Sequence, residues 1–355
     1  MRIYVTGATG FVGSAVVAEA LRRRHEVVAV VRPGSRAELS QQFPDHGNRI
    51  TEARIDLRSM EGLAESLDGV DSVVHLAAAK TGDFYTQFAG TVVATENLLA
   101  AMKQANVAQL VAMSTFSVYN YLAMKPGTLV DEQSPIESDP KLRDEYAQTK
   151  LLQERLYQRF ESAGGGRVVI LRPGMIYGPD NLWHALLGAE LGPRFLRIGS
   201  KATLPLTYVE NCAEAIIDAA EALADRPGEL TGEIINIVDD NLPTQAQYAD
   251  LVAARIEIPP TISVPWPVMN AATTLLKKVN ESLAGGRAKF PGIAVPDRLH
   301  ARFKPLRYTN AKAKRLLGWS PRFPLEEAIA RSSGIEATHA GATGGPVSDP
   351  AGTPS

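Results

Sequence analysis

Short apolar runs alternate with longer stretches of helical periodicity over residues 1–240. Several of the runs are apolar almost throughout, which is typical of parallel strands covered by helices on both faces. The runs that predict strands are 2–6, 26–32, 49–55, 72–77, 109–114, 167–172 and 233–238. Helical periodicity lies between them, at 11–24, 59–67, 89–105, 144–163 and 210–224. This alternation predicts an α/β fold, a doubly wound parallel sheet.

The alternation loosens after residue 175. Segments 176–204 and 241–330 carry loops, short helices and several prolines, and they predict a smaller, discontinuous C-terminal substrate-binding lobe. The main domain then consists of 1–175 and 205–240. Residues 332–355 hold only two large aliphatic side chains, Ile335 and Val347, too few to offset the entropy of ordering, so we expect a disordered tail.

Composition and charge exclude several classes of protein. The 355 residues are 45% hydrophobic and 21% charged, which is ordinary for a globular protein. Because 37 basic residues oppose 39 acidic ones, no global field attracts nucleic acid, and we expect no such partner. No cluster of cysteine and histidine has the spacing of a metal site, so no metal is expected.

The chain also carries signals of location. Cys212 is the one cysteine, so no intrachain disulfide forms, and this fits a reducing compartment. No apolar run reaches the roughly 18 residues of a transmembrane helix. The first residues enter a strand pattern at once and leave no room for a signal peptide. These features predict a cytoplasmic protein.

A glycine-rich turn, TGATGFVG at 6–13, follows the first strand and precedes the first helix. Gly7 allows the tight turn, Gly10 lets the backbone approach a pyrophosphate, and Gly13 permits close packing of helix on strand. Backbone N–H groups near Thr9, Phe11 and Val12 would point at the phosphates. The combination predicts a Rossmann-type dinucleotide site, the alternative being a tight turn without a ligand.

The end of the second strand bears on which dinucleotide is bound. An acidic residue there would accept hydrogen bonds from a ribose 2′-hydroxyl, but this chain has Arg32, followed by Arg36. Guanidinium groups suit a 2′-phosphate, so NADP is preferred over NAD, the alternative being solvated arginines. Asp56 and Leu57, after the third strand, are candidates to contact the adenine. An ordinary helix cap at Asp56 is the other reading.

Tyr146 and Lys150 stand four residues apart on a predicted helix, so their side chains share one face. A phenol has an ordinary pKa of about 10 and is a poor base near neutrality. A nearby ammonium favours the phenolate, as does the charge of an oxidised nicotinamide. Tyr146 is therefore a candidate to exchange a proton with an alcohol or carbonyl oxygen while hydride moves. A surface contact on the helix is the alternative.

Context selects this pair, because the Y-x-x-x-K spacing also occurs at 121–125 and 308–312. The pair at 121–125 lies in a stretch without helical periodicity, just before a proline. The pair at 308–312 lies after the last predicted strand.

Two hydroxyls, Ser114 and Thr115, follow the fifth strand, at the edge where ligands bind in open α/β sheets. Either could hydrogen-bond a substrate oxygen or simply form the turn.

Together these motifs resemble the extended short-chain dehydrogenase/reductases of the NAD-dependent epimerase/dehydratase family. The resemblance covers residues 1–330 and rests on their order and spacing. The motifs are TGATGFVG, RIDL (54–57), VVHLAAA (73–79), MSTFSVYN (113–120), YAQTK (146–150), LRPGMIYGP (171–179), TYVENCAEAI (207–216) and LLGWSPRFPLEEAI (316–329).

The resemblance implies roles for individual residues. Thr115 takes the family's Ser/Thr position, Tyr146 becomes the acid/base, and Lys150 also holds the nicotinamide ribose. Pro173 would lie near the carboxamide. The residues implied to lie under the cofactor are Ala77, Ala78 and Ala79. Helices equivalent to 89–105 and 144–163 form a dimer in this family, so a homodimer is a further expectation.

The chain departs from the family pattern in three places. The helix motif N-V-x-G-T reads TVVAT at 91–95, so the usual structural Asn is Thr91. Nucleotide-sugar members read R-x-x-N-x-Y-G-P, whose Asn helps to bind substrate, and here that position is Met175. Their C-terminal R-x-G-D is absent from RFKPLRYT at 302–309. The form R-P-x-x-x-Y-G-P is more similar to the 3β-hydroxysteroid dehydrogenase and dihydroflavonol reductase branches, which act on apolar ketones and alcohols.

We therefore predict an NADP-preferring enzyme, with NAD as the alternative cofactor, that interconverts a secondary alcohol and a ketone on a mainly apolar small molecule. A nucleotide-sugar epimerase or dehydratase, which returns the hydride it borrows, is the first alternative. A non-catalytic dinucleotide sensor is the second, although it has no need of Thr115, Tyr146 and Lys150 together.

A basic strip at 298–322 is either a solvated face or a site for an anionic substrate or membrane surface.

Overall fold

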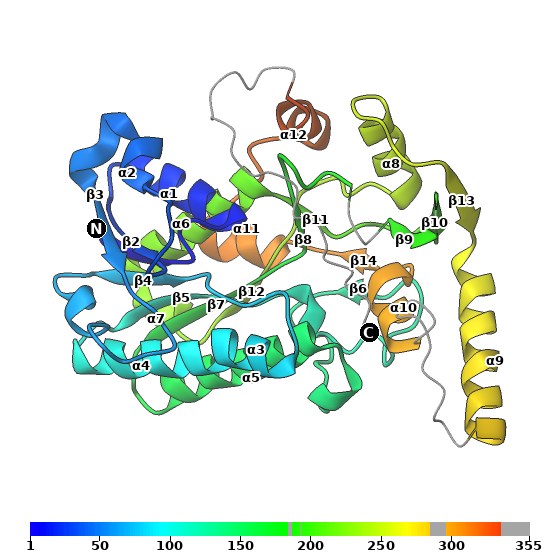
Figure 1. The fold of residues 1–355 in the computed structure, drawn as a ribbon, viewed down its shortest axis with the longest axis horizontal. Helices are drawn as coiled ribbons and strands as arrows, with labels where there is room; N and C mark the ends of the chain where they lie inside the picture. Colours follow the sequence, from blue (N-terminus) through cyan, green and yellow to red (C-terminus); the bar gives the residue numbers. More distant parts are fainter. Residues whose placement is uncertain (184–186, 192, 285–295, 335–355) are drawn as a thin grey trace, which may run out of the picture.

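The computed structural model describes residues 1–183, 187–191, 193–284 and 296–334 (Figure 1). Within these residues seven parallel strands form the central sheet, in the order β12-β7-β5-β4-β1-β2-β3. They are β1 (Arg2–Thr6), β2 (Glu26–Val31), β3 (Ile50–Arg54), β4 (Ser72–His75), β5 (Gln109–Met113), β7 (Arg167–Pro173) and β12 (Ile234–Ile237). Each matches a run that the apolar pattern predicted, so the doubly wound α/β fold is confirmed.

Helices cover both faces of this sheet (Figure 1). On one face lie α1 (Phe11–Arg22) and α6 (Val209–Asp225), and on the other α4 (Ala94–Gln104) and α5 (Glu145–Ser162). Each face of the sheet packs against its helices in a separate hydrophobic core, and β1 contributes side chains to both. Ile3 and Val5 pack with α1 and α6, while Tyr4 packs toward α4 and α5. The period of two along a strand thus explains why these strands are apolar throughout.

Two of the predicted helices differ from the structure. The helix over 89–105 begins with a π-helical turn, Ala89–Val93, before α4. The helix predicted over 59–67 is wrong, since this stretch is a series of turns ending in a short 3₁₀ segment, Glu65–Leu67. Gly62 has a φ of +68°, which a right-handed helix cannot accommodate.

The remaining elements lie mostly at one end of the sheet (Figure 1). The described strands outside the central sheet are β6 (Leu129–Val130), β8 (Met175–Tyr177), β9 (Gly188–Leu191), β10 (Arg194–Ile198), β11 (Leu206–Tyr208), β13 (Thr261–Val264) and β14 (Arg307–Tyr308). The described helices are α2 (Leu39–Gln42), α3 (Phe84–Phe88), α7 (Pro227–Leu230), α8 (Gln245–Ala253), α9 (Trp266–Ala284), α10 (Pro296–Phe303), α11 (Ala311–Leu317) and α12 (Leu325–Ser332).

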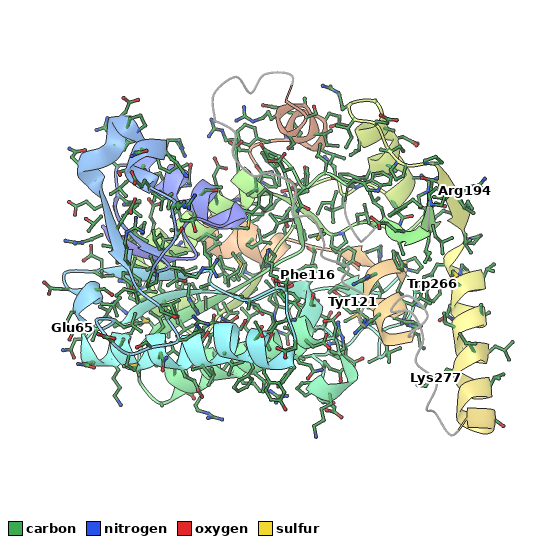
Figure 2. All side chains as sticks on the ribbon, viewed as in Figure 1. Glu65, Phe116, Tyr121, Arg194, Trp266 and Lys277 are labelled. Carbon is green, nitrogen blue, oxygen red and sulfur yellow. The ribbon has the colours of Figure 1, made fainter. Side chains whose placement is uncertain are left out.

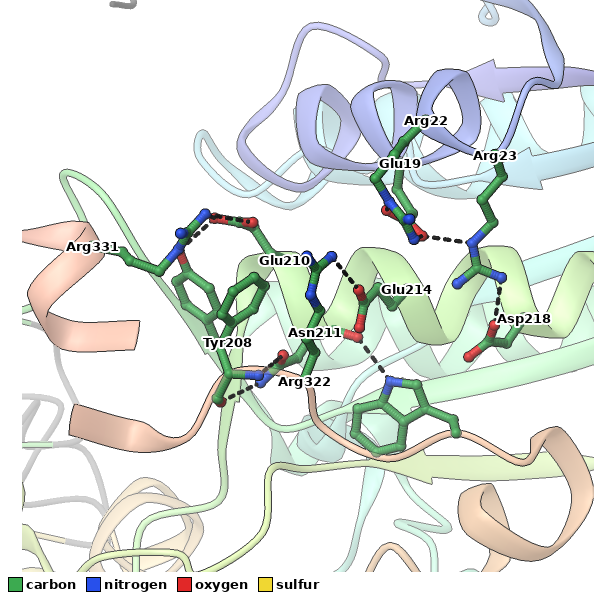
Figure 3. Close-up of polar contacts among 12 residues, drawn as sticks. Glu19, Arg22, Arg23, Tyr208, Glu210, Asn211, Glu214, Asp218, Arg322 and Arg331 are labelled. Carbon is green, nitrogen blue, oxygen red and sulfur yellow. Dashed lines mark hydrogen bonds and ion pairs between the residues drawn. The ribbon is translucent and has the colours of Figure 1, made fainter. Parts of the chain in front are cut away.

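The C-terminal segment returns to the central sheet. Ala313 and Leu317 of α11 and the buried Trp319 join the core formed by α1 and α6. The Asn211 side chain holds this segment by accepting from Phe323 N and donating to Phe323 O, each at 3.0 Å (Figure 3). The predicted disordered tail begins at the last residue of α12, and its residues 335–355 lie outside the described residues.

Candidate functional site

The strand order reverses between β1 and β4, and the carboxyl ends of the strands at such a reversal are where open α/β sheets bind ligands. Gly7 follows β1 with a φ of +68°. A Cβ on Gly7 would lie 3.2 Å from Ala77 N, and one on Gly13 would lie 2.0 Å from Gly7 O. Glycine is therefore required at both positions, by the turn and by the close approach of α1.

The rest of this turn is open to solvent. Thr9 and Gly10 are exposed, Phe11 and Val12 are partly exposed, and no side chain of the described residues caps the first turn of α1. Free N–H groups at an exposed helix start fit a pyrophosphate, so the turn suits the dinucleotide that the sequence predicts.

The segment that follows β4, residues 76–79, is held in place next to the glycine-rich turn. Thr6 Oγ1 accepts hydrogen bonds from Leu76 N and Ala77 N, both at 3.1 Å. Ala79 N donates to Thr91 Oγ1 at 3.0 Å. Thr91, at the position of the family's structural Asn, thus holds the 77–79 segment in place. Ala77, Ala78 and Ala79 are partly buried, and Ala77 lies beside Gly7; small side chains in this segment leave room for a cofactor.

The residues proposed for the adenosine end lie at the ends of β2 and β3. Arg32 and Arg36 are exposed, and neither side chain makes a hydrogen bond or ion pair within the described residues. Asp56 accepts from Arg58 N and pairs with the Arg58 guanidinium, which holds the pKa of this carboxyl below its ordinary value. It forms a turn and caps no helix. The Leu57 side chain is buried in the core beneath α4.

Tyr146, Lys150 and Thr115 meet at the carboxyl end of β5. Tyr146 and Lys150 lie on α5, which begins at Glu145 because Asp144 caps it by accepting from Ala147 N. Thr115 lies close enough to Tyr146 for its hydroxyl to affect the pKa of the phenol, and Thr115 Oγ1 accepts from Ser117 N at 3.2 Å. Lys150 Nζ donates to Met113 O, at the last residue of β5, at 2.6 Å. The three predicted catalytic residues are therefore neighbours.

The two candidate hydroxyls have different surroundings. Ser114 donates to Glu154, whose carboxylate forms a buried ion pair with Arg172. Arg172 in turn hydrogen-bonds to the hydroxyl of Tyr119. Ser114 thus belongs to a buried structural network, and Thr115 is the hydroxyl that faces Tyr146. Pro173, the other residue implied by the resemblance, is buried at the end of β7 next to this network.

Burial dominates the electrostatics of the site. It raises the pKa of Tyr146, while the nearby Thr115 hydroxyl acts in the opposite direction. Burial lowers the pKa of Lys150 to about 7, since Glu154 offsets the loss of hydration only in part. The ammonium effect expected from the sequence is outweighed here, and Tyr146 is held as a phenol at neutral pH.

A chain of buried polar groups ends at Lys150, and the motifs did not indicate it. Its members are Thr6, His75, Thr95, Gln153 and Lys150, which we call the polar string. Lys150 Nζ donates to Gln153 Oε1, and Gln153 Nε2 donates to Thr95 Oγ1 at 2.8 Å. His75 Nε2 lies 2.9 Å from the same oxygen. Thr6 Oγ1 lies 2.7 Å from His75 Nδ1.

The hydrogen bonds of the polar string determine which atom of each side chain carries the proton. Thr6 Oγ1 already accepts two backbone N–H groups, so its hydroxyl donates to His75 Nδ1. His75 then carries its proton on Nε2 and donates to Thr95, whose hydroxyl donates to Thr91 O. Burial lowers the pKa of His75 to about 3, so this histidine is neutral at physiological pH. The string therefore positions Lys150 relative to β1 and β4 and relays no proton.

Among the described residues, no group of three or more His, Cys, Asp or Glu side chains could hold a metal ion. No helix in the same part of the chain is long and apolar enough to cross a membrane. Cys212 is free and buried in the core, in keeping with the small core residue that a thiol usually is.

The sequence pattern of the NAD dependent epimerase/dehydratase family matches residues 3–237. The chain belongs to this family. A relative from Bacillus subtilis, named an uncharacterized UDP-glucose epimerase, is 30% identical over 254 residues, 67% of this chain and 76% of that protein. The 3 beta-hydroxysteroid dehydrogenase/Delta 5→4-isomerase of Mycobacterium tuberculosis is 27% identical over 343 residues, 92% and 88% of the two chains.

Solved structures of epimerase/dehydratase family members share the fold. The UDP-glucose-4-epimerase of Stenotrophomonas maltophila, solved with NAD, superimposes with a TM-score of 0.71 at 19% identity, over 94% of this chain and 96% of that one. Family membership and the resemblance to its steroid dehydrogenase branch are thus confirmed. The chain is an enzyme of the NAD(P)-dependent extended short-chain dehydrogenase/reductase type, and the alternative of a non-catalytic sensor is set aside.

Proposed function

We propose that this enzyme interconverts a secondary alcohol and a ketone on a mainly apolar small molecule. The observation that carries the proposal is the meeting of Thr115, Tyr146 and Lys150 at the carboxyl end of β5. Bound NAD(P) supplies or accepts the hydride. Tyr146, kept protonated by burial, donates its proton to a carbonyl oxygen in reduction and takes it back in oxidation.

The other two residues assist Tyr146. The Thr115 hydroxyl hydrogen-bonds the same substrate oxygen and stabilises its developing charge. An ammonium has three N–H donors, and Lys150 uses two of them on Met113 and Gln153. The third is left for the nicotinamide ribose. Gly7, Gly10, Gly13 and the 77–79 segment would hold the rest of the cofactor.

Replacing Tyr146 by Phe tests the catalytic assignment. We expect turnover of NADPH with ketone substrates to fall about 10²- to 10⁴-fold, because the proton donor is lost. Cofactor affinity, measured by fluorescence titration, should change less than about twofold. Tyr85→Phe, at an exposed tyrosine of α3, is the control and should retain full activity. Activity retained by Tyr146→Phe would remove Tyr146 from the mechanism.

NADP preference is a second part of the proposal. Its support is the pair of exposed and unpaired arginines, Arg32 and Arg36, beyond β2. Arg32→Asp should weaken NADPH binding at least about tenfold more than NADH binding, since a carboxylate repels the 2′-phosphate. Equal losses for the two cofactors in calorimetric titrations would contradict a contact between Arg32 and this phosphate.

The nucleotide-sugar epimerase remains a second candidate function. The name of the Bacillus subtilis relative favours it, and Met175 at the position of the family's substrate-binding Asn opposes it. Net consumption of cofactor separates the two functions, because an epimerase returns its hydride.

We also propose that segments 176–204 and 241–330 form the substrate lobe, and that the enzyme is a cytoplasmic homodimer paired through α4 and α5. The lone buried Cys212 supports the location. The contact of α4 with α5 over one face of the sheet supports an interface on that side.

A further inference from the structure

The basic strip at 298–322 contains eight lysines and arginines and no carboxylate. Most of these cations are already paired within the described residues. Lys304 donates to the carbonyls of Tyr121 and Met124, and Arg307 donates to Gly127 O. The ion pairs of the strip are Lys312 with Glu233, Lys314 with Asp240, and Arg322 with Glu214. The strip as a whole is therefore no anion-binding surface.

Three arginines of the strip, Arg298, Arg302 and Arg315, make no hydrogen bond or ion pair within the described residues. Arg315 is an exposed residue of α11 and is solvated. Arg298 and Arg302 are four residues apart on α10, so they share one face of that helix, and both are partly buried. A partly buried guanidinium without a partner loses hydration, and no hydrogen bond or ion pair compensates for that loss. Such an arrangement is uncommon in proteins.

The packing of α10 fixes where that face points. Leu299 and Phe303 are fully buried against Trp266, which anchors the helix on the small lobe. Ala301 packs against the apolar cluster that contains Phe116 and Tyr121, in the segment that follows Thr115. Figure 2 shows Phe116 and Tyr121 on the side of the sheet that faces α10. The helix thus lies next to the catalytic segment.

Arg302 is also electrostatically coupled to the start of α5. Its opposite charge is Asp144, the cap of α5, two residues before Tyr146. Asp144 forms no ion pair with it and is engaged by Ala147 N. Burial lowers the pKa of the Arg302 guanidinium, so Asp144 does not compensate for the lost hydration. Arg302 thus lies within electrostatic range of the start of α5, and within the described residues it has no ion-pair partner, so it has capacity for an anion.

We propose that Arg302, with Arg298 one turn before it, binds a carboxylate or phosphate group of the substrate. A guanidinium binds such groups through two parallel N–H donors, which fixes the position of the substrate as well as its charge. The substrate is then an acidic alcohol or ketone whose apolar body lies between this anion and Tyr146. The assignment rests on the proposed function, since it names the substrate class of the same site.

A matched pair of ketones tests the assignment by binding. The first probe is 3-oxo-5β-cholan-24-oic acid, and the second is its methyl ester, which lacks only the charge. Affinities are measured by calorimetry with NADP⁺ present, since the oxidised cofactor prevents reduction of a ketone. The wild type should bind the acid at least about tenfold more tightly than the ester, as expected for a hydrogen bond to a charged group. UDP-glucose is the third probe and represents the phosphate source.

Three variants locate the effect. Arg302→Gln should bind acid and ester equally, Arg302→Lys should retain part of the preference, and Arg315→Gln should behave as wild type. Arg302 has no partner to lose within the described residues, so the melting temperature of the unliganded Arg302→Gln variant should be unchanged, which shows that it folds.

Each outcome bears on one proposal. Arg302-dependent preference for the steroid acid supports a carboxylate substrate. Binding of UDP-glucose alone, lost in Arg302→Gln, supports the anion site with phosphate as its ligand and overturns the apolar-ketone function. Equal binding of acid and ester by the wild type overturns the anion site and leaves the oxidoreductase function intact. The site is likewise overturned if neither charged probe binds in an Arg302-dependent way.

Discussion

At the scale of single residues, Lys150 is the group whose surroundings matter most. Its ammonium is buried, and two acceptors, the Met113 carbonyl and the Gln153 amide oxygen, replace its hydration. Gln153 is itself fixed by Thr95 and so by His75. The position of the Lys150 ammonium therefore depends on a glutamine that no motif includes.

Substitutions at Gln153 should move the pH profile in opposite directions. Gln153→Leu removes an acceptor that favours the ammonium, so the pKa of Lys150 should fall below about 7. The alkaline limb of kcat/KM should then shift to lower pH. Gln153→Glu adds a carboxylate and should shift the limb to higher pH. Gln158→Leu, at an exposed glutamine of α5, is the control. Identical profiles for all the variants would show that Gln153 does not act through Lys150.

The sequence could identify the catalytic residues but not their partners. Tyr146 and Lys150 are recognised because four residues on one helix bring them to one face, which is local information. The strand position alone does not distinguish Ser114 from Thr115, and only the family resemblance selects Thr115, because Glu154, which engages Ser114, lies on another element. The pairing of Gln153 with Thr95 and His75 joins three separate elements and has no local signal.

At the scale of elements, the turn between β1 and α1 combines two constraints. The left-handed φ of Gly7 aims the chain back over the sheet, and the bare Cα of Gly13 lets α1 approach the Gly7 carbonyl. Both constraints were predictable from the glycine spacing. The wrong prediction of a helix at 59–67 also involves a glycine with positive φ. Gly62 adopts such a φ and interrupts a stretch whose composition is otherwise helical.

Alanine at Gly13 should disrupt this turn. Its Cβ would lie 2.0 Å from Gly7 O, so α1 or the turn must shift. We expect a loss of about 2 kcal/mol or more in the free energy of unfolding, together with weaker cofactor binding. Gly228→Ala is the matched control, because a Cβ there meets nothing within 4 Å, and stability should change by about 0.5 kcal/mol at most. Equal denaturant midpoints for both variants would contradict the packing argument.

At the scale of the whole molecule, the end of the chain stabilises its beginning. Trp319 is buried in the core of α1 and α6, and its Nε1 donates to Asn211 O at 3.1 Å. Arg322 and Arg331 add ion pairs to Glu214 and Glu210 on α6 (Figure 3). The sequence indicated a family motif at 316–329 but not this contact, since no local pattern specifies which distant helix a tryptophan meets.

Truncation of Trp319 should weaken the whole fold. Trp319→Ala should lower the free energy of unfolding by about 3–5 kcal/mol, as is usual for a large buried aromatic. Trp319→Phe keeps most of the apolar contact and loses the hydrogen bond, so a smaller loss of about 1–2 kcal/mol is expected. Denaturant unfolding measures both. If Trp319→Ala lost less than about 1 kcal/mol, the C-terminal segment would be peripheral to the core.

This contact also determines when the protein can finish folding during its synthesis. Ile3 and Trp319 belong to one core yet lie about 300 residues apart along the chain. A ribosome adds roughly 5–20 residues per second, so the first strand waits at least about 15 s for Trp319 to be made. During that interval the nascent chain exposes the apolar surface of α6 that Trp319 later covers. Chaperones that bind emerging apolar segments should therefore associate with this protein until Trp319 has been translated.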